Sequence, residues 1–318
     1  MSLTRRALLS SAAIGTGLLA TGCVPDLVRP KGNLPSTDWV VDRLDQLIAN
    51  TGQDHFRRLT VRDGSLTADL LVSRSVVRQF QHYSEKTGWE EPHSPNVLDP
   101  EVDPPTSAPL AELHLDRMPQ WDAQLRETED GLVFNVDETG HLHLWASGGG
   151  EVFSLLLDGS GRYPLLSDDL ASDVVRAIKE IVAEYGDQAQ SVGGLNDFVH
   201  VDCNVAGSTL GMRVIRYATI GPQATVTDAL FSPETIFDPL TVDPTLALEL
   251  LKTIPAKAKL KGQAWDWRIS RPPTGGEPTL SYGVGTDGPT QRVWVDASGK
   301  IIGVQQSDCI PGTGWCPR

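Results

Sequence analysis

The sequence is poor in positive charge for a chain of 318 residues. It carries 27 lysines and arginines against 41 aspartates and glutamates, a net charge of −14 at pH 7. Removing residues 1–22 takes away Arg5 and Arg6 and no acid, which leaves 25 basic and 41 acidic residues and a net charge of −16. A nucleic-acid-binding protein needs a basic face, and anionic lipid attracts basic segments. The composition therefore argues against nucleic acid as a partner and against adhesion to a membrane by charge.

The sequence also lacks the short motifs that mark common reactions. It has no Gly-x-Ser-x-Gly nucleophile turn, no Walker phosphate loop and no His-Glu-x-x-His zinc motif. No Gly-x-Gly-x-x-Gly segment opens a helix after a strand. We therefore expect a non-enzymatic protein that has no cofactor.

Long apolar runs are missing except near the start of the chain. The run from Ala7 to Ala20 is 14 residues long, shorter than the roughly 20 that span a bilayer. It follows Arg5 and Arg6 and ends on small residues before Cys23. A cationic start, a short apolar middle and a small-residue end are typical of an export signal. We expect residues 1–22 to be a signal peptide; an uncleaved membrane anchor is the alternative.

Two short stretches within this segment resemble bacterial export signatures. Residues 4–9, Thr-Arg-Arg-Ala-Leu-Leu, resemble the twin-arginine signal, which implies export in the folded state, with the general secretory route as the alternative. Residues 19–23, Leu-Ala-Thr-Gly-Cys, resemble the lipoprotein box. That resemblance implies a Cys23 modified with acyl chains such as palmitate and a body held on the extracytoplasmic face of a cell membrane. An ordinary signal peptide with an incidental Cys23 is the alternative.

Cysteine is scarce, with four residues in the chain. Cys309 and Cys316 bracket Ile-Pro-Gly-Thr-Gly-Trp, and exported proteins can keep disulfides. We expect them to form a disulfide bridge. By limiting the entropy of the unfolded chain, the bridge would stabilise the folded state by about 2.5 kcal/mol. Cys203 lies on the apolar side of the alternating segment 198–205, so we expect it to be buried. Its pairing with Cys309 or Cys316 is the alternative.

One arrangement recurs along the chain: a helix, a break, and then several short strands. It starts near residues 38, 168 and 243; the first helix has an apolar stripe from Val40 to Ile48 and ends at Gly52.

The expected parts are a signal peptide (1–22), a tether (23–37), a helix-plus-sheet module (38–89), a proline-rich linker (90–125), a central module (126–236) and a C-terminal module (237–318). The expected strands are 56–61, 66–72, 76–83, 132–136, 141–145, 152–157, 163–166, 198–205, 210–219, 263–270, 279–284, 292–295 and 301–305.

This order predicts an α+β fold in which helices pack on one face of antiparallel sheets. The layout, together with the hairpin at residues 293–301, resembles the small PepSY-like modules of bacterial exported lipoproteins. The resemblance implies repeated helix-plus-sheet modules and transfers no catalytic residue.

His141 and His143 alternate along an expected strand, so both imidazoles point to the same face. Histidine is the commonest metal ligand, but a metal site needs further ligands. Asp137, Glu138 or His200 could supply them, although no spacing requires it. A solvated strand face is the simpler interpretation, so the two histidines are weak metal candidates.

Trp265, Trp267 and Trp294 are the remaining candidate site residues. Exposed aromatic patches mark binding surfaces for a glycan, a lipid or a partner. The alternative interpretation is that these tryptophans fill the core beneath the third helix.

Together these features favour a membrane-anchored lipoprotein of the bacterial envelope with a binding or scaffolding role. Its expected partner is an envelope protein or a cell-wall polymer. A carrier of an apolar ligand is one alternative, and a metal-dependent envelope hydrolase that uses the His141 and His143 face is another.

Overall fold

The computed structural model describes residues 34–83, 88–98, 105–125, 129–148, 152–167, 169–195, 197–205, 210–227, 235–271 and 276–306. These residues belong to one compact unit that spans residues 33–318. The expectations for Arg5, Arg6, Cys23, Cys309 and Cys316 lie outside the described residues.

Short helices separate groups of strands. The helices are α1 (Thr37–Thr51), α2 (Met118–Asp122), α3 (Ala171–Tyr185), α4 (Thr245–Leu251) and α5 (Ile254–Lys257), with 3-10 turns η1 (Leu110–Leu113), η2 (Leu115–Arg117) and η4 (Pro239–Thr241). Helix α1 is bounded as its sequence predicts. The Ser36 hydroxyl accepts a hydrogen bond from the Trp39 N–H, and Gly52 ends the helix in the left-handed conformation. In the described ranges, no helix has the length and apolar character needed to cross a membrane.

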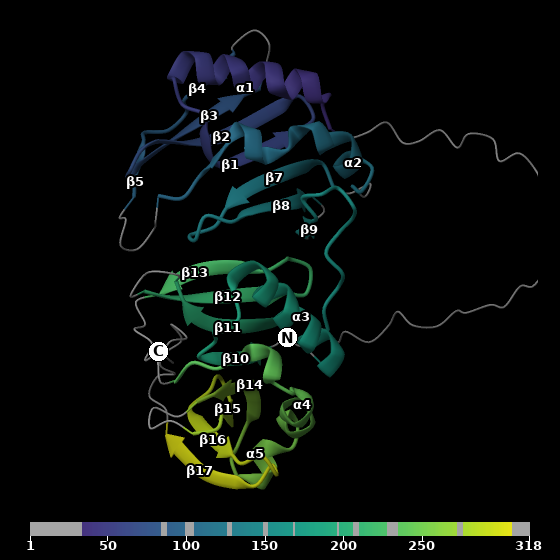
Figure 1. Cartoon of the computed structure of the whole chain (residues 1–318), viewed down its shortest axis with the longest axis vertical. Helices are drawn as coiled ribbons and strands as arrows, with labels where there is room; N and C mark the ends of the chain where they lie inside the picture. The colour runs from purple at the N-terminus through teal and green to yellow at the C-terminus, as the bar shows by residue number, and fades with distance from the viewer. Residues whose placement is uncertain are drawn as a thin grey trace, which may run out of the picture. The chain divides into compact units, whose positions relative to one another are not determined.

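The described strands form two antiparallel sheets (Figure 1). The first has the order β4-β3-β2-β1-β7-β8-β9, with β5 beside β3 and β6 beside β1. Its strands are β1 (His55–Arg62), β2 (Ser65–Ser73), β3 (Val76–His82), β4 (Trp89–Glu90), β5 (Asn96–Val97), β6 (Ala108–Pro109), β7 (Gly131–Val136), β8 (Leu142–Ser147) and β9 (Phe153–Leu155).

The second sheet has the order β13-β12-β11-β10-β14-β15-β16-β17. Its strands are β10 (Ser191–Leu195), β11 (Phe198–Asn204), β12 (Gly211–Tyr217), β13 (Gln223–Thr227), β14 (Gln263–Ser270), β15 (Thr279–Gly285), β16 (Gln291–Val295) and β17 (Ile301–Gln306).

Both sheets follow the same plan. Each consists of two meanders whose first strands pair with each other, β1 with β7 and β10 with β14. Helices α1, α2 and α3 each precede one meander, and α4 with α5 precedes the last. The recurrence expected near residues 38, 168 and 243 is present, and a fourth unit begins at α2. That helix is too short for its apolar spacing to be visible in the sequence.

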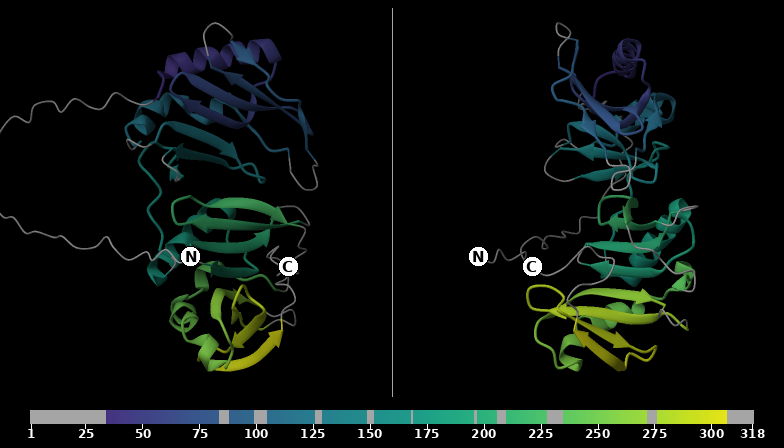
Figure 2. Two further views of the ribbon diagram at one scale, coloured as in Figure 1. Left: turned by 180° about the vertical axis from the view of Figure 1, so that it is seen from behind. Right: turned by 90° about the vertical axis from the view of Figure 1, so that its left-hand side faces the viewer.

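Each sheet buries one face beneath its helices. Val40, Leu44 and Leu47 of α1 pack with Trp121 of α2 on the first sheet, and the right-hand view of Figure 2 shows α1 nearly end-on. On the second sheet, the apolar stripe of α3 joins residues from α4 and α5 in a separate core. The expected α+β class, with helices on one face of antiparallel sheets, is confirmed.

Strand pairing divides the chain differently from the expected modules. Within residues 126–236, β7–β9 complete the first sheet and β10–β13 belong to the second. The expected linker 90–125 is partly packed, because Leu113 and Trp121 are fully buried in the first core. The strand expected at residues 163–166 is wrong, since this segment forms no strand.

Candidate functional site

Asp137, which directly follows β7, ties together three distant segments of the chain. Its carboxylate accepts six hydrogen bonds. The donors are the Thr139 N–H and hydroxyl and the His141 N–H at Oδ1, and His143 Nε2, the Tyr185 hydroxyl and the Ala224 N–H at Oδ2. The three bonds at Oδ2 measure 3.1, 2.6 and 3.1 Å, in that order. Asp137 therefore joins the β7–β8 turn of the first sheet to α3 and β13.

The electrostatics of this cluster favour an ionised Asp137. Burial alone would raise the pKa of its carboxyl, but hydrogen bonds from His143 and Tyr185 outweigh burial and hold that pKa well below its usual range. Burial, together with nearby Glu184 and Asp137, raises the pKa of the Tyr185 phenol. Tyr185 therefore stays protonated and donates to Asp137.

His141 and His143 both lie beside Tyr185, but neither occupies a simple solvated face. His143 is 8% exposed and its Nε2 lies 3.1 Å from Asp137 Oδ2. The His141 ring lies 4.4 Å from the Tyr185 ring, centroid to centroid. The expected solvated face is therefore wrong for His143, which is a buried donor to a carboxylate. In the part of the chain that the structure describes, no group of three histidine, cysteine, aspartate or glutamate side chains is placed to hold a metal ion.

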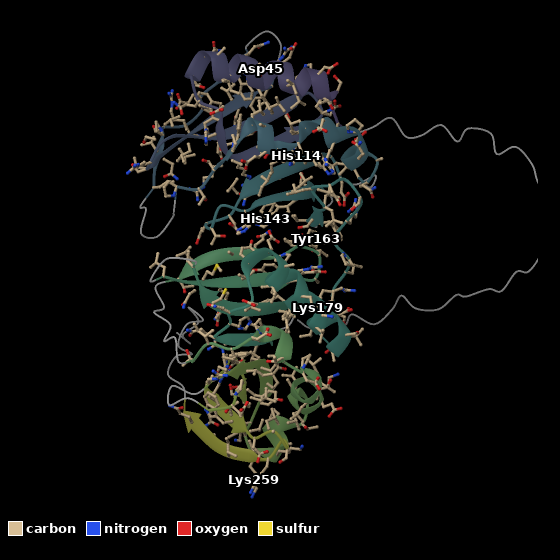
Figure 3. All side chains as sticks on the ribbon, in the orientation of Figure 1. Asp45, His114, His143, Tyr163, Lys179 and Lys259 are labelled. Carbon is tan, nitrogen blue, oxygen red and sulfur yellow. The ribbon has the colours of Figure 1, made fainter. Side chains whose placement is uncertain are left out.

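A small, partly open cavity of about 200 Å³ adjoins this cluster. We call it the Glu184 cavity. It is lined by Leu142, His143, Leu144, Ser154, Leu155, Leu157, Tyr163 and Glu184. Figure 3 labels His143 and Tyr163, which come from β8 and from the segment that follows β9. Burial raises the pKa of Glu184 to about 7, with Asp137 adding to the rise and His143 opposing it.

The sequence did not single out Glu184, Tyr185 or Tyr163. Tyr185 lies four residues after Ile181, on the continuation of the apolar stripe of α3, and that spacing was the available signal. Nothing local indicates that Glu184 faces a cavity, because its neighbours there come from β8, β9 and the segment that follows β9.

The second sheet carries buried ion pairs on the face opposite α3. Arg213 Nε lies 2.6 Å from Asp202 Oδ1, Arg268 Nη2 lies 2.7 Å from Asp202 Oδ2, and Arg292 pairs with Asp266. His200 lies on the same face, and no described residue hydrogen-bonds to either of its ring nitrogens. Burial lowers the pKa of His200 to about 3, so its ring is neutral near pH 7.

The three candidate tryptophans do not form one exposed patch. Trp267 is 2% exposed and belongs to the second core. A β-bulge between Ala264 and Asp266 interrupts the alternation of β14, so Ala264 rather than Trp265 packs against that core. Trp265 is half-buried and its Nε1 donates to the Gly285 carbonyl at 3.0 Å, while Trp294 is half-buried on β16. The core interpretation therefore holds for Trp267.

A larger hollow lies beside α4 and the last strands. Its volume is about 470 Å³. Its lining is mostly apolar and includes three acidic residues: Leu246, Ile269, Pro278, Thr279, Leu280, Val295, Ala297 and Ile302 with Asp243, Glu277 and Asp296.

No family model and no curated protein matches this sequence. Among solved structures, a putative lipoprotein from Clostridium difficile 630 is 14% identical, with a TM-score of 0.26, over 41% of this chain and 90% of its own. The DNA polymerase sliding clamp of Pseudomonas aeruginosa is 12% identical, with a TM-score of 0.13, over 79% of this chain and 60% of the clamp chain. Proliferating Cellular Nuclear Antigen of Entamoeba histolytica is 11% identical, with a TM-score of 0.14, over 76% of this chain and 89% of its own. None of these similarities is close enough to identify a family or a function.

Proposed function

We propose that this chain is an exported lipoprotein of the bacterial envelope, held on the extracytoplasmic face of a membrane by acyl chains on Cys23. The observation that carries the proposal is the order of features in residues 1–23: Arg5 and Arg6, a 14-residue apolar run, small residues and then a cysteine. Each buried lipid methylene contributes about 0.8 kcal/mol, so two or more chains give stable anchoring where one is marginal.

The body of the lipoprotein has a binding or scaffolding role rather than an enzymatic one. Asp137, the most interconnected carboxylate of the candidate site, accepts six hydrogen bonds. A carboxylate occupied in this way holds elements together, whereas a general base needs a free lone pair within reach of its substrate. Its partner is an envelope protein or a cell-wall polymer, the macromolecules present at the proposed location. The acidic composition disfavours nucleic acid.

Substitution of the proposed lipid attachment site tests the anchor. Cys23→Ala should move the protein from the membrane fraction to the soluble fraction, whereas Cys203→Ala, which changes a buried cysteine, should leave it in the membrane fraction. Mass spectrometry of the native protein should find an acylated Cys23 at the N-terminus. An unmodified chain that starts at Met1 in the cytosol would overturn the proposal.

The export route is tested separately. Arg5→Lys with Arg6→Lys should block export if the twin-arginine route is used, since that signal depends on both arginines. Continued export of the double variant would assign the chain to the general secretory route and leave the lipid anchor standing.

Transport of an apolar ligand is a second candidate function, favoured by the mostly apolar hollow beside α4. Its volume of about 470 Å³ falls within the range of small-molecule sites. The Cys23→Ala protein, which has no lipid of its own, should then copurify with a lipid that organic extraction and mass spectrometry detect. A clean extract would exclude this function.

A further inference from the structure

The Glu184 cavity lies at a corner where the first sheet is incomplete. Strand β8 begins at Leu142, but its pairing with β9 begins only at Leu144, which lies opposite Leu155. The chain then turns back, and the Tyr163 N–H donates to the Ser154 carbonyl at 3.1 Å. The shorter β9 therefore leaves part of β8 uncovered, and the cavity occupies this space beside the last turn of α3.

Glu184 brings an unpaired carboxyl group to this cavity. No described residue hydrogen-bonds or forms an ion pair with its side chain, although the neighbouring Glu180 pairs with Arg216 at 2.6 Å. A half-buried carboxylate without a partner loses hydration and gains nothing in return. A cation in the cavity would restore this lost interaction.

The groups around Glu184 also favour a cation. Asp137 is ionised, and Tyr163 stays neutral because burial, with Glu184, Glu180 and Asp158, raises its pKa to about 12. His143 donates from Nε2 to Asp137, because a carboxylate can only accept, so this ring nitrogen is already occupied. The nearby cation Arg216 is fully buried and already bonded to Glu180 and to the carbonyls of Pro164 and Ile220.

The remaining walls are apolar except for Ser154, whose hydroxyl accepts a hydrogen bond from the Gly221 N–H. Leu142, Leu144, Leu155 and Leu157 line the cavity, and Leu144 and Leu155 are each 1% exposed. A wall of this kind accommodates methylene groups and offers nothing to a fully hydrated metal ion. A volume of about 200 Å³ is suited to one small group rather than to a whole lipid or sugar chain.

We propose that the Glu184 cavity binds a primary aliphatic ammonium group, such as the end of an amine-bearing side chain on an envelope polymer or peptide. The ammonium pairs with the Glu184 carboxylate and its methylenes lie against the four leucines. This inference rests on the proposed binding role of the body and is independent of the lipid on Cys23.

The test uses n-butylammonium as the probe and the full chain carrying Cys23→Ala, followed by calorimetry and by NMR of the glutamate carboxyl carbons. Millimolar binding is expected at pH 8, because a probe of five heavy atoms has limited affinity. Binding should weaken about tenfold at pH 5.5, where Glu184 is protonated. Saturation with the probe should lower the pKa of Glu184, and n-butanol should bind more weakly than n-butylammonium at pH 8.

Two glutamate variants separate the cavity from general charge effects. Glu184→Gln should lose the preference for n-butylammonium over n-butanol, while Glu249→Gln, on the exposed surface of α4, should keep it. The proposal is overturned if wild-type protein binds the two probes equally, if Glu184→Gln retains the preference, or if the probe does not bind. None of these results would affect the lipid anchor, which the Cys23→Ala fractionation tests alone.

Discussion

Gly194 and Trp267 pair across β10 and β14, and they fit together only because Gly194 has no side chain. A Cβ atom on Gly194 would lie 2.6 Å from the indole Nε1 of Trp267. On the neighbouring residue of the same strand, a Cβ on Gly193 would lie 2.5 Å from Cε1 of His200. The two glycines thus accommodate an indole and an imidazole at the seam between the two meanders of the second sheet.

Gly194→Ala should therefore destabilise the protein. The added methyl group must displace the Trp267 indole within a close-packed core, and overpacking of this kind costs about 1–3 kcal/mol. Gly303→Ala is the matched control, because Gly303 also lies in a strand and its Cβ would meet nothing within 4 Å. Urea unfolding followed by tryptophan fluorescence should show a lower midpoint for Gly194→Ala alone; equal midpoints would contradict the packing at this seam.

Helix α1 could be predicted from the sequence, whereas strand β10 at this seam could not. The apolar stripe from Val40 to Ile48 and the terminal Gly52 are local signals, and they place α1 within two residues of its observed bounds. β10 contains two adjacent glycines, which are unfavourable in strands and read as a turn. The reason for those glycines is the bulk of Trp267 and His200, and Trp267 lies more than 70 residues away in the sequence.

The candidate site was less predictable than the fold. Alternation predicts that His141 and His143 share one side, but it could not show that Tyr185 packs beside them. Asp137 and Tyr185 are 48 residues apart, and Asp137 and Ala224 are 87 apart. Hydrogen bonds between such distant residues depend on how the two sheets and α3 assemble. The periodicity of a helix or a strand carries no information about that assembly.

Asp137→Asn should weaken the folded state and change its acid sensitivity. The pKa of Asp137 is lower in the folded protein than in the unfolded chain, so its carboxylate stabilises the fold above the unfolded value of about 3.9 and stops doing so as the pH falls through the folded value. His143, Tyr185 and the Ala224 N–H all donate to the Asp137 carboxylate, and the amide group of asparagine would present a further donor to one of them. At pH 7 we expect the free energy of unfolding to fall by about 3 kcal/mol.

Urea titrations between pH 3 and pH 7 test this expectation. Asp130→Asn is the control, because Asp130 is exposed and lies 3.7 Å from Arg62 in a surface pair worth about 1 kcal/mol or less. Asp137→Asn should also show a smaller loss of stability on acidification than the wild type. Equal effects of the two substitutions would contradict the role assigned to Asp137.

Counting thiols tests both the burial of Cys203 and the predicted bridge between Cys309 and Cys316. In the exported protein carrying Cys23→Ala, three cysteines remain, and the bridge would leave only Cys203 free. Cys203 is 3% exposed, and burial raises the pKa of its thiol to about 12, so few thiolates are available to react.

Ellman's reagent should therefore label the native protein slowly and should find one thiol after unfolding in urea. Three thiols in the unfolded protein would rule out the bridge. Rapid labelling of the native protein would instead contradict the burial of Cys203 in the second core.

Glu184→Gln should stabilise the protein at alkaline pH and leave it unchanged at acidic pH. The pKa of Glu184 is about 7 in the folded protein, against about 4.3 in an unfolded chain. Between these values the unfolded chain binds fewer protons than the folded protein, so the wild type loses stability as the pH rises from about 4.3 to about 7. Glutamine cannot ionise and avoids this loss.

At pH 8 the free energy of unfolding of Glu184→Gln should exceed that of the wild type by about 2 kcal/mol. This is less than the difference between the folded and unfolded pKa values implies, because water reaches the carboxyl group through the cavity. Unfolding free energies at pH 4, 6 and 8 should diverge between wild type and Glu184→Gln, whereas Glu249→Gln should follow the wild type throughout. A gain that is equal at pH 4 and pH 8 would mean that ionisation of Glu184 is not its source. Glutamine would pack at position 184 equally well, so a ligand that pairs with the carboxyl group explains Glu184 better than packing does.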